Sequence, residues 1–157
     1  MKNKYIILLA ALFTFTLSHA QKGVIINSGA KIELNDGATL VIGDDLGLIN
    51  NSSESVFNGE VIFSGTALQE IGGSEIISFN ILEIDNNNGV FLAVDSRIAD
   101  ELILTSGVLD LDEYNLTLSD ASSISGTFSS DNMISVDGNG RLIREISGND
   151  YFLLPIG

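Results

Sequence analysis

Short runs in which apolar and polar residues alternate are the dominant pattern along the chain. Clear examples are residues 31–34, 39–42, 60–63 and 115–118. Clusters of Gly, Asn, Asp and Ser separate the runs, for instance at 35–37, 86–89 and 137–140. Alternation with a period of two predicts strands with one buried face, and the clusters predict turns. No stripe with helical periodicity is evident, so we expect an all-β protein.

The apolar pairs also recur at a longer interval. Leu40/Ile42 is followed by Val61/Phe63, Leu82/Ile84 and Leu102/Leu104, at steps of 21, 21 and 20 residues. Two looser series accompany it, one through Leu48, Ile71, Leu92 and Leu111, the other through Val56, Ile77, Ile98 and Leu118. Three apolar positions that recur together predict a coil with three strands per turn, a right-handed parallel β-helix or β-solenoid. About six or seven turns, each rising ~4.8 Å, would form a rod of roughly 30 Å.

An antiparallel β-sandwich is the alternative architecture, because hairpins at a spacing of ~8–12 residues produce similar strand patterns. A sandwich does not require the recurrence near twenty residues, so we favour the solenoid. Its corners need left-handed or bridging backbone conformations, which Gly and Asn adopt at little cost. The 16 glycines of the chain suit that need.

The first twenty residues have the layout of a secretory signal peptide. Lys2 and Lys4 are followed by the apolar run 5–17, and Ser18-His19-Ala20 places small residues at the −3 and −1 positions before Gln21. The run is shorter than the ~20 residues that cross a bilayer. We therefore expect 1–20 to be removed on export, which leaves 21–157 as one β-solenoid domain without a membrane span. Its expected location is the cell surface, the extracellular medium or the periplasm.

The mature part is strongly acidic and has neither Cys nor His. It keeps five of the seven basic residues and all 21 acidic ones, a balance of −16. This charge argues against nucleic acid and anionic membranes as partners, since both require a basic surface. The chain has no Cys, and its single His is His19 in the predicted signal peptide. These absences leave no disulfide framework and no support for nucleophilic catalysis.

Several segments resemble parts of large secreted surface proteins that are cargo of the type IX secretion system of Gram-negative bacteria. The run Asn58-Gly-Glu-Val-Ile-Phe-Ser-Gly-Thr-Ala-Leu-Gln-Glu-Ile-Gly-Gly73 is similar to one of their rungs, as are residues 79–86 and 102–111. Residues 144–157 resemble the segment that opens their next module. The resemblance implies an N-terminal solenoid of an adhesin-like protein. Such cargo carries a C-terminal sorting domain that is lacking here, so we expect a domain truncated at its C-terminal end.

Two carboxylates are the best counterpart of the sites with which some parallel β-helix enzymes cleave acidic polysaccharides. Asp110 and Asp112 alternate with Leu109 and Leu111, which predicts that both point outward from one strand, ~7 Å apart. That separation suits an acid/base pair. A solvated acidic strand is the simpler interpretation, and we predict no enzyme. Three arginines are the available clamps, and nothing in the spacing links them to the pair: Arg97, Arg141 and Arg144.

Two turn clusters carry oxygen ligands of the kind that Ca²⁺ accepts. Asp85 and Asn87 lie in one cluster, and Asp137 and Asn139 lie in the other. Neither cluster completes the twelve-residue calcium loop or a calcium-binding nonapeptide repeat. Corner turns are therefore the simpler interpretation, and weak Ca²⁺ binding remains a secondary hypothesis.

Three aromatic residues are candidates for stacking on sugars: Phe91, Tyr114 and Tyr151.

The leading hypothesis is a non-enzymatic structural or adhesive module of an exported protein, with a glycan, a protein or an extracellular surface as its partner. The alternatives are a carbohydrate-active enzyme of the β-helix type and a calcium-stabilised carbohydrate-binding module.

The apolar residues 151–156 further predict an exposed last turn. Terminal turns normally need a polar cap, and open strand edges favour association. We therefore expect self-association at that end.

Overall fold

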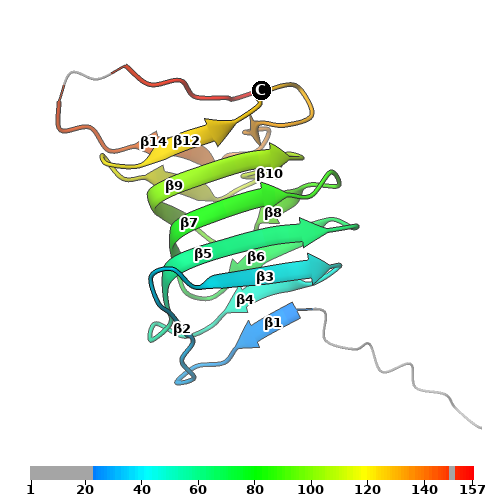
Figure 1. The fold of residues 1–157 in the computed structure, drawn as a ribbon, viewed down its shortest axis with the longest axis vertical. Helices are drawn as coiled ribbons and strands as arrows, with labels where there is room; N and C mark the ends of the chain where they lie inside the picture. The colour runs from blue at the N-terminus through cyan, green and yellow to red at the C-terminus, as the bar shows by residue number, and fades with distance from the viewer. Residues whose placement is uncertain (1–22, 149–150) are drawn as a thin grey trace, which may run out of the picture.

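The computed structural model describes residues 23–148 and 151–157, which form a coil of 14 strands without a helix (Figure 1). The predicted signal peptide lies outside the described residues. The described part of the chain contains no helix that is long and apolar enough to cross a membrane.

One side of the coil, here called the A face, is a six-stranded parallel sheet. Its strands in spatial order are β1 (Gly23–Ile26), β4 (Gly47–Asn50), β6 (Gln69–Gly73), β8 (Val90–Leu92), β10 (Leu109–Asp110) and β13 (Ile134–Ser135). Six stacked strands correspond to five complete turns, fewer than the six or seven expected.

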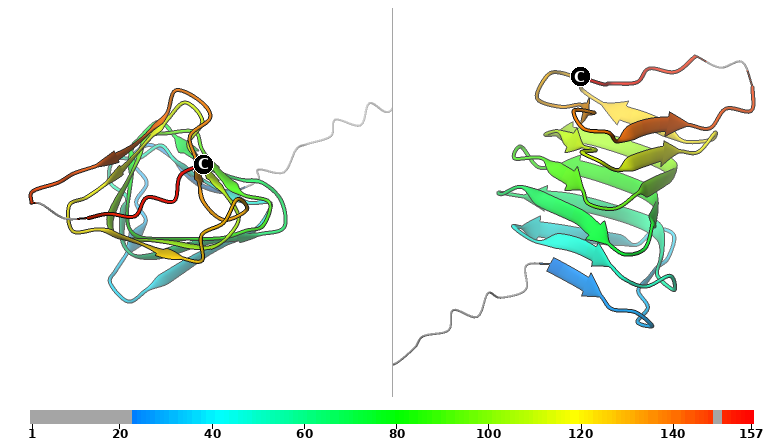
Figure 2. Two further views of the ribbon diagram at one scale, coloured as in Figure 1. Left: turned by 90° about the horizontal axis from the view of Figure 1, so that it is seen from above. Right: turned by 180° about the vertical axis from the view of Figure 1, so that it is seen from behind.

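The other two sides share one bent sheet, because its three long strands turn a corner midway. These are β5 (Val56–Gly65), β7 (Ile77–Asp85) and β9 (Ser96–Ser106), with register shifts at the corner. Their first halves form the B face with β2 (Glu33–Leu34), β11 (Asn115–Leu118) and β14 (Arg141–Arg144). Their second halves form the C face with β3 (Thr39–Asp44) and β12 (Ser123–Gly126). Seen along its axis, the coil is triangular (Figure 2).

The coil is right-handed and parallel throughout its ladders. In Figure 1 the front strands run from left to right while the chain climbs from β1 towards β14. This is the hand that parallel crossover connections almost always take. Every pairing between the described strands is parallel, and the antiparallel bridge Ser129–Asn132 lies within a turn. The solenoid prediction is confirmed, and the sandwich alternative is wrong.

The first predicted series is stacked as expected, and so is the second from Leu48 to Leu92. Val61 pairs with Leu40 and Leu82, and Leu82 pairs with Leu102. On the A face Ile71 likewise pairs with Leu48 and Leu92. These side chains alternate with outward ones and are buried in one continuous core, except that Leu40 is partly buried and packs against it. Each fully buried aliphatic side chain contributes ~1.5–3 kcal/mol to the folded state.

The third predicted series is wrong in part. Ile98 pairs with Phe79 rather than Ile77, and Phe79 pairs with Phe57 rather than Val56. The step from Ile98 to Leu118 is correct. The turns that lead to this face have unequal lengths. A constant spacing of about 21 residues therefore selected Ile77, two positions before Phe79, and Val56, one position before Phe57. The true column brings the rings of Phe57 and Phe79 together, with centroids 5.8 Å apart.

Candidate functional site

The corner between the C and A faces contains the buried amide side chains of Gln69, Asn86 and Asn132. Asn86 was predicted to lie in a turn, and the other two were not singled out from the sequence. Gln69 donates two hydrogen bonds of 2.9 Å, to the carbonyl oxygens of Ile42 and Leu46 in the preceding turn. Asn132 donates to the carbonyl oxygens of Leu104 and Thr127, each at 2.8 Å. Buried backbone carbonyls need such donors, because water cannot reach them. These amides therefore hold successive corners together.

Asn86 is the centre of this corner. Its Nδ2 donates to the carbonyl oxygen of Ala67 at 2.7 Å and to Oε1 of Gln69 at 2.9 Å, and its Oδ1 accepts the backbone N–H of Asn88 at 2.9 Å. Only 1% of its surface is exposed. The side chain thus joins two turns of the coil and is unavailable to an external ligand.

Replacing Asn86 with alanine will lower the free energy of unfolding by about 2–4 kcal/mol, since several hydrogen bonds disappear and buried acceptors lose their donor. Urea unfolding monitored by circular dichroism measures the change. The exposed neighbour Asn87 provides the control, and its replacement with alanine should change the free energy by less than about 0.5 kcal/mol. Equal effects of the two substitutions would contradict the role of Asn86.

The carboxylates proposed as an acid/base pair belong to a turn. Strand β10 ends at Asp110, and Asp112 follows in a left-handed conformation with φ of 46°. The backbone N–H of Asp112 donates to Oδ1 of Asp110 at 2.9 Å. The expectation that both residues share one strand is therefore wrong. Aspartate commonly stabilises a turn by accepting the N–H two residues later, and Asp110 has this role.

The calcium candidates are divided between two different corners of the coil. Asp85 ends β7 and accepts the hydroxyl of Ser106 at 2.9 Å, and Asn87 is exposed in the following turn. Asp137 and Asn139 lie between β13 and β14, where Asn139 donates to Glu113 at 2.6 Å. Within 23–148 and 151–157, no group of three or more His, Cys, Asp or Glu side chains is arranged to hold a metal ion. Weak Ca²⁺ binding stays a prediction.

The three aromatic candidates do not form a common sugar-binding platform. Phe91 lies on the outer surface of β8, Tyr114 packs against the core after β10, and Tyr151 is fully exposed near the C-terminus. They belong to separate elements, and no ring contact joins any two of them among those that the structure records.

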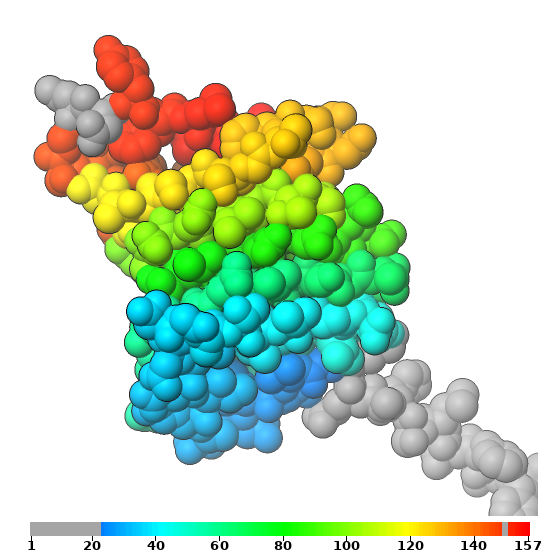
Figure 3. Space-filling model, in the orientation of Figure 1, coloured from blue at the N-terminus to red at the C-terminus, as the bar shows by residue number. Residues whose placement is uncertain are grey.

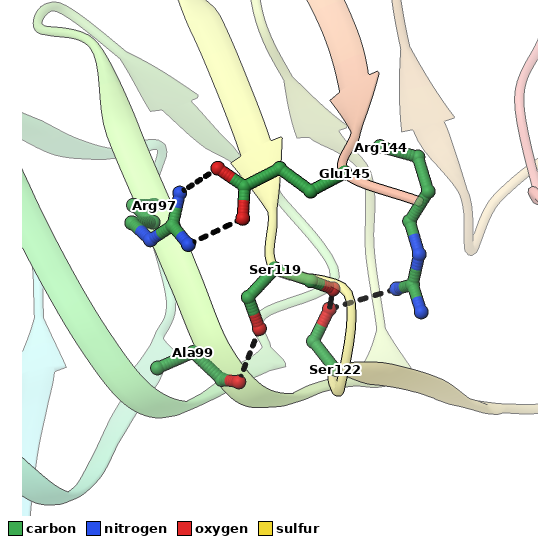
Figure 4. Close-up of polar contacts among 6 residues, drawn as sticks. All are labelled: Arg97, Ala99, Ser119, Ser122, Arg144 and Glu145. Carbon is green, nitrogen blue, oxygen red and sulfur yellow. Dashed lines mark hydrogen bonds and ion pairs between the residues drawn. The ribbon is translucent and has the colours of Figure 1, made fainter. Parts of the chain in front are cut away.

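The arginines stabilise the last turn of the coil. Arg97 of β9 forms two hydrogen bonds of 2.6 Å with the carboxylate of Glu145, just after β14 (Figure 4). Arg144 pairs in register with buried Leu118, and its guanidinium donates to the Ser122 hydroxyl and the Asp120 carbonyl oxygen, each at 2.8 Å. Arg141 is exposed on β14. The candidate clamps thus lie on strands of the B face, whereas Asp110 is on the A face.

The hydrogen bonds from Arg97 lower the pKa of Glu145, and those from Ser147 lower the pKa of Asp120. A lowered pKa in the folded state means that the stabilisation is complete above the ordinary carboxylate range and is lost as the pH falls through the lowered value. Because both carboxylates are exposed, we expect a local effect on β14 and the residues after it.

Acidification from about pH 5 to about pH 2 will therefore loosen β14 before the coil unfolds. The measurement is the pH dependence of the β14 amide signals in NMR spectra. Glu145→Gln should remove most of the dependence at Arg141–Arg144, whereas the distant substitution Glu54→Gln should leave it unchanged. Identical profiles for all three proteins would rule out the ion pair as the cause.

Residues 151–157 cross the C-terminal end of the coil (Figure 2). The backbone N–H of Ile134 donates to the carbonyl oxygen of Pro155 at 2.8 Å, and the Phe152 ring lies 4.1 Å from the guanidinium carbon of Arg144. A cavity of about 280 Å³ remains between this segment and the residues from Ser122 to Ile124. Tyr151 and Leu153 stay largely exposed, at 103% and 73%. The end of the core is only partly covered.

We expect residues 21–157 to self-associate through this apolar end, with a mass that increases with concentration in light scattering. Tyr151→Ser combined with Leu153→Ser should shift the protein towards monomer, because it removes the two most exposed apolar side chains of the segment. Val41→Ser provides the control, because Val41 is equally an exposed apolar residue but lies on β3, away from the C-terminal end of the coil. A parent protein that stays monomeric at high concentration would refute the prediction.

The C face carries a surface pattern that the sequence analysis did not recognise. The outward residues of three successive strands are Glu60 and Ile62, then Ile81 and Glu83, then Glu101 and Ile103. Carboxylates and aliphatic side chains therefore alternate both along and across the strands. The alternation already predicted that every second residue of these strands points outward. The surface pattern could therefore have been found from the sequence.

A hollow of about 210 Å³ adjoins this face at the corner with the B face. Asp36, Thr39 and Glu60 contribute polar groups to its lining, and Ile81 contributes an apolar side chain. Gly59 makes room there, since a Cβ at this position would lie 2.2 Å from the carbonyl oxygen of Ala38.

Comparison of the chain with protein-family models, curated proteins and solved structures finds no match.

Proposed function

We propose that the solenoid is a non-enzymatic structural or adhesive module of an exported protein at the cell surface or in the extracellular medium. The observation that carries this proposal is that the polar side chains form hydrogen bonds which hold the coil together. Asn86 joins two turns, Asp110 stabilises a turn, and Arg97 holds the last strand. A rod built in this way uses these polar groups for its own stability and presents its outer faces to the surroundings.

Export rests on the signal-peptide layout of residues 1–20, and the resemblance to type IX secretion cargo supports a destination at the cell surface. The test is to express the full chain in a Gram-negative bacterium and to determine the location and N-terminus of the product. We expect a protein that begins at Gln21 outside the cytoplasm. Leu9→Arg interrupts the apolar run and should retain the uncleaved chain inside. Cytoplasmic retention of the parent chain would contradict export.

The enzyme alternative is tested with residues 21–157 and acidic polysaccharides such as polygalacturonate and alginate, in the presence and absence of Ca²⁺. We expect no release of shortened products above the level of a heat-denatured control. Turnover that Asp110→Asn abolishes, while the protein remains folded by circular dichroism, would replace the structural proposal with a catalytic one.

A further inference from the structure

We propose that the C face is a docking surface for a cationic polypeptide in which basic (Lys or Arg) and aliphatic side chains alternate at every second residue, so that both kinds lie on one face of an extended strand. This inference rests on the proposed adhesive role and names its contact surface. The face consists of β3, residues 60–65 of β5, 81–85 of β7, 101–106 of β9 and β12. Figure 3 shows it towards the viewer, with successive turns stacked as parallel bands.

Charge distribution is the first support for this surface. The outward carboxylates Glu60, Glu83 and Glu101 lie on three successive strands of the C face. The lysines and arginines of the described residues all lie elsewhere: Lys31 precedes β2, Arg97 is in the B-face half of β9, and Arg141 and Arg144 are in β14. The two ion pairs that the structure describes, Lys31–Glu33 and Arg97–Glu145, also lie off this face. The C face therefore attracts cations without a neutralising side chain of its own.

The carboxylates are also oriented. The hydroxyl of Thr39 donates to Oε2 of Glu60 at 3.1 Å, and the hydroxyl of Thr105 donates to Oε1 of Glu83 at 2.6 Å. Each acceptor keeps its other oxygen and further lone pairs for an ammonium or guanidinium donor. Side chains held in this way lose less conformational entropy when a partner binds.

The apolar residues between the carboxylates identify the partner as a polypeptide rather than a simple cation. Val41 is 57% exposed, and Ile62, Ile81 and Ile103 are half-buried on the same surface. Their spacing, ~4.8 Å across the strands and ~7 Å along them, equals the side-chain spacing of any other β-sheet. A pleated partner in which basic and aliphatic residues alternate at every second position carries both kinds on one face, and would therefore pair with both kinds of position at once. The hollow beside Glu60 would admit one long basic side chain at the edge.

The experiment uses residues 21–157 and a synthetic peptide with the repeat Lys-Ser-Val-Ser, which places Lys and Val on the same face of a strand. A peptide with the repeat Glu-Ser-Val-Ser is the charge control. Fluorescence anisotropy gives the dissociation constants at low and high salt. We expect the Lys peptide to bind, the Glu peptide not to bind, and high salt to weaken the complex. Failure of the parent protein to bind the Lys peptide at low salt would overturn the inference.

Two matched triple variants separate this face from the overall acidity. Glu60→Gln, Glu83→Gln and Glu101→Gln together should weaken binding about tenfold. Glu54→Gln, Glu75→Gln and Glu113→Gln remove the same charge at the corner between the A and B faces, and should change binding less than about twofold. Equal losses would show attraction to net charge alone and would overturn the inference.

A further variant tests the apolar contribution. Ile62→Ser with Ile103→Ser leaves the charge unchanged and should weaken binding about tenfold at both salt concentrations. Thermal unfolding of each variant confirms that the coil is intact. An unchanged affinity would contradict a polypeptide partner that contacts the aliphatic positions. None of these outcomes depends on export or turnover, so a failure here leaves the proposed structural role to its own tests.

Discussion

Phe79→Ala will lower the free energy of unfolding by about 3–5 kcal/mol, the largest effect that we expect from one side-chain truncation. Phe79 is completely buried and lies in the middle of the column formed with Phe57 and Ile98. Its ring is tilted by 40° against that of Phe57. Truncation removes contacts in two directions along the coil and leaves a cavity that parallel turns on both sides prevent from closing.

Chemical denaturation measures this loss, and the adjacent residue provides the control. Ser78 belongs to the same strand but is exposed on the outside of the B face. Ser78→Ala should change stability by less than about 0.5 kcal/mol. If the two substitutions had similar effects, Phe79 could not occupy the interior column.

Gly107→Ala will destabilise the coil strongly, with an expected cost of about 2–5 kcal/mol. Gly107 has a φ of 86°, and a Cβ at this position would lie 1.8 Å from the backbone oxygen of Asn86. The substitution therefore combines the cost of a left-handed conformation with a collision against backbone. Since that oxygen accepts the N–H of Gly89 at 2.8 Å, relief of the collision would disturb the corner below.

Gly37 separates these two contributions. It has a similar φ of 76°, but nothing lies within 4 Å of the position that its Cβ would occupy. Gly37→Ala should cost only about 1–2 kcal/mol, the conformational part of the effect. Denaturation curves of the two variants give the difference directly. A loss at Gly37 as large as that at Gly107 would exclude the close approach of stacked corners.

The strands and their first stacking series were predictable because inward positions must be apolar and must repeat once per turn. Leu40, Val61, Leu82 and Leu102 satisfy both conditions at nearly constant intervals. The partners of Ile98 were not predictable in the same way. Phe79 and Ile77 are both buried in β7, so hydrophobicity alone cannot decide which of them it meets. The register depends on turn lengths that only the folded coil fixes.

Polar residues were harder to interpret than apolar ones. An Asn followed by Asn and Gly predicts a turn, but the pattern does not reveal that the Asn86 side chain points into the corner. Asp110 has the spacing of a candidate acid, yet its carboxylate accepts a backbone N–H of its own turn. The chemical type of a side chain was known from the sequence, whereas its partner depended on which turns became neighbours.

The stacking register underlies both the proposed structural role and the proposed docking surface. Cysteine cross-linking tests it most directly, because the chain contains no Cys of its own. Ser78 pairs with Arg97, and Arg97 pairs with Thr117, all on the outside of the B face. Ser78→Cys with Arg97→Cys should form an intramolecular disulfide under mild oxidation, since paired strands lie ~4.8 Å apart. Ser78→Cys with Thr117→Cys, two turns apart, should remain reduced. Cross-linking of the second pair but not the first would contradict the coil.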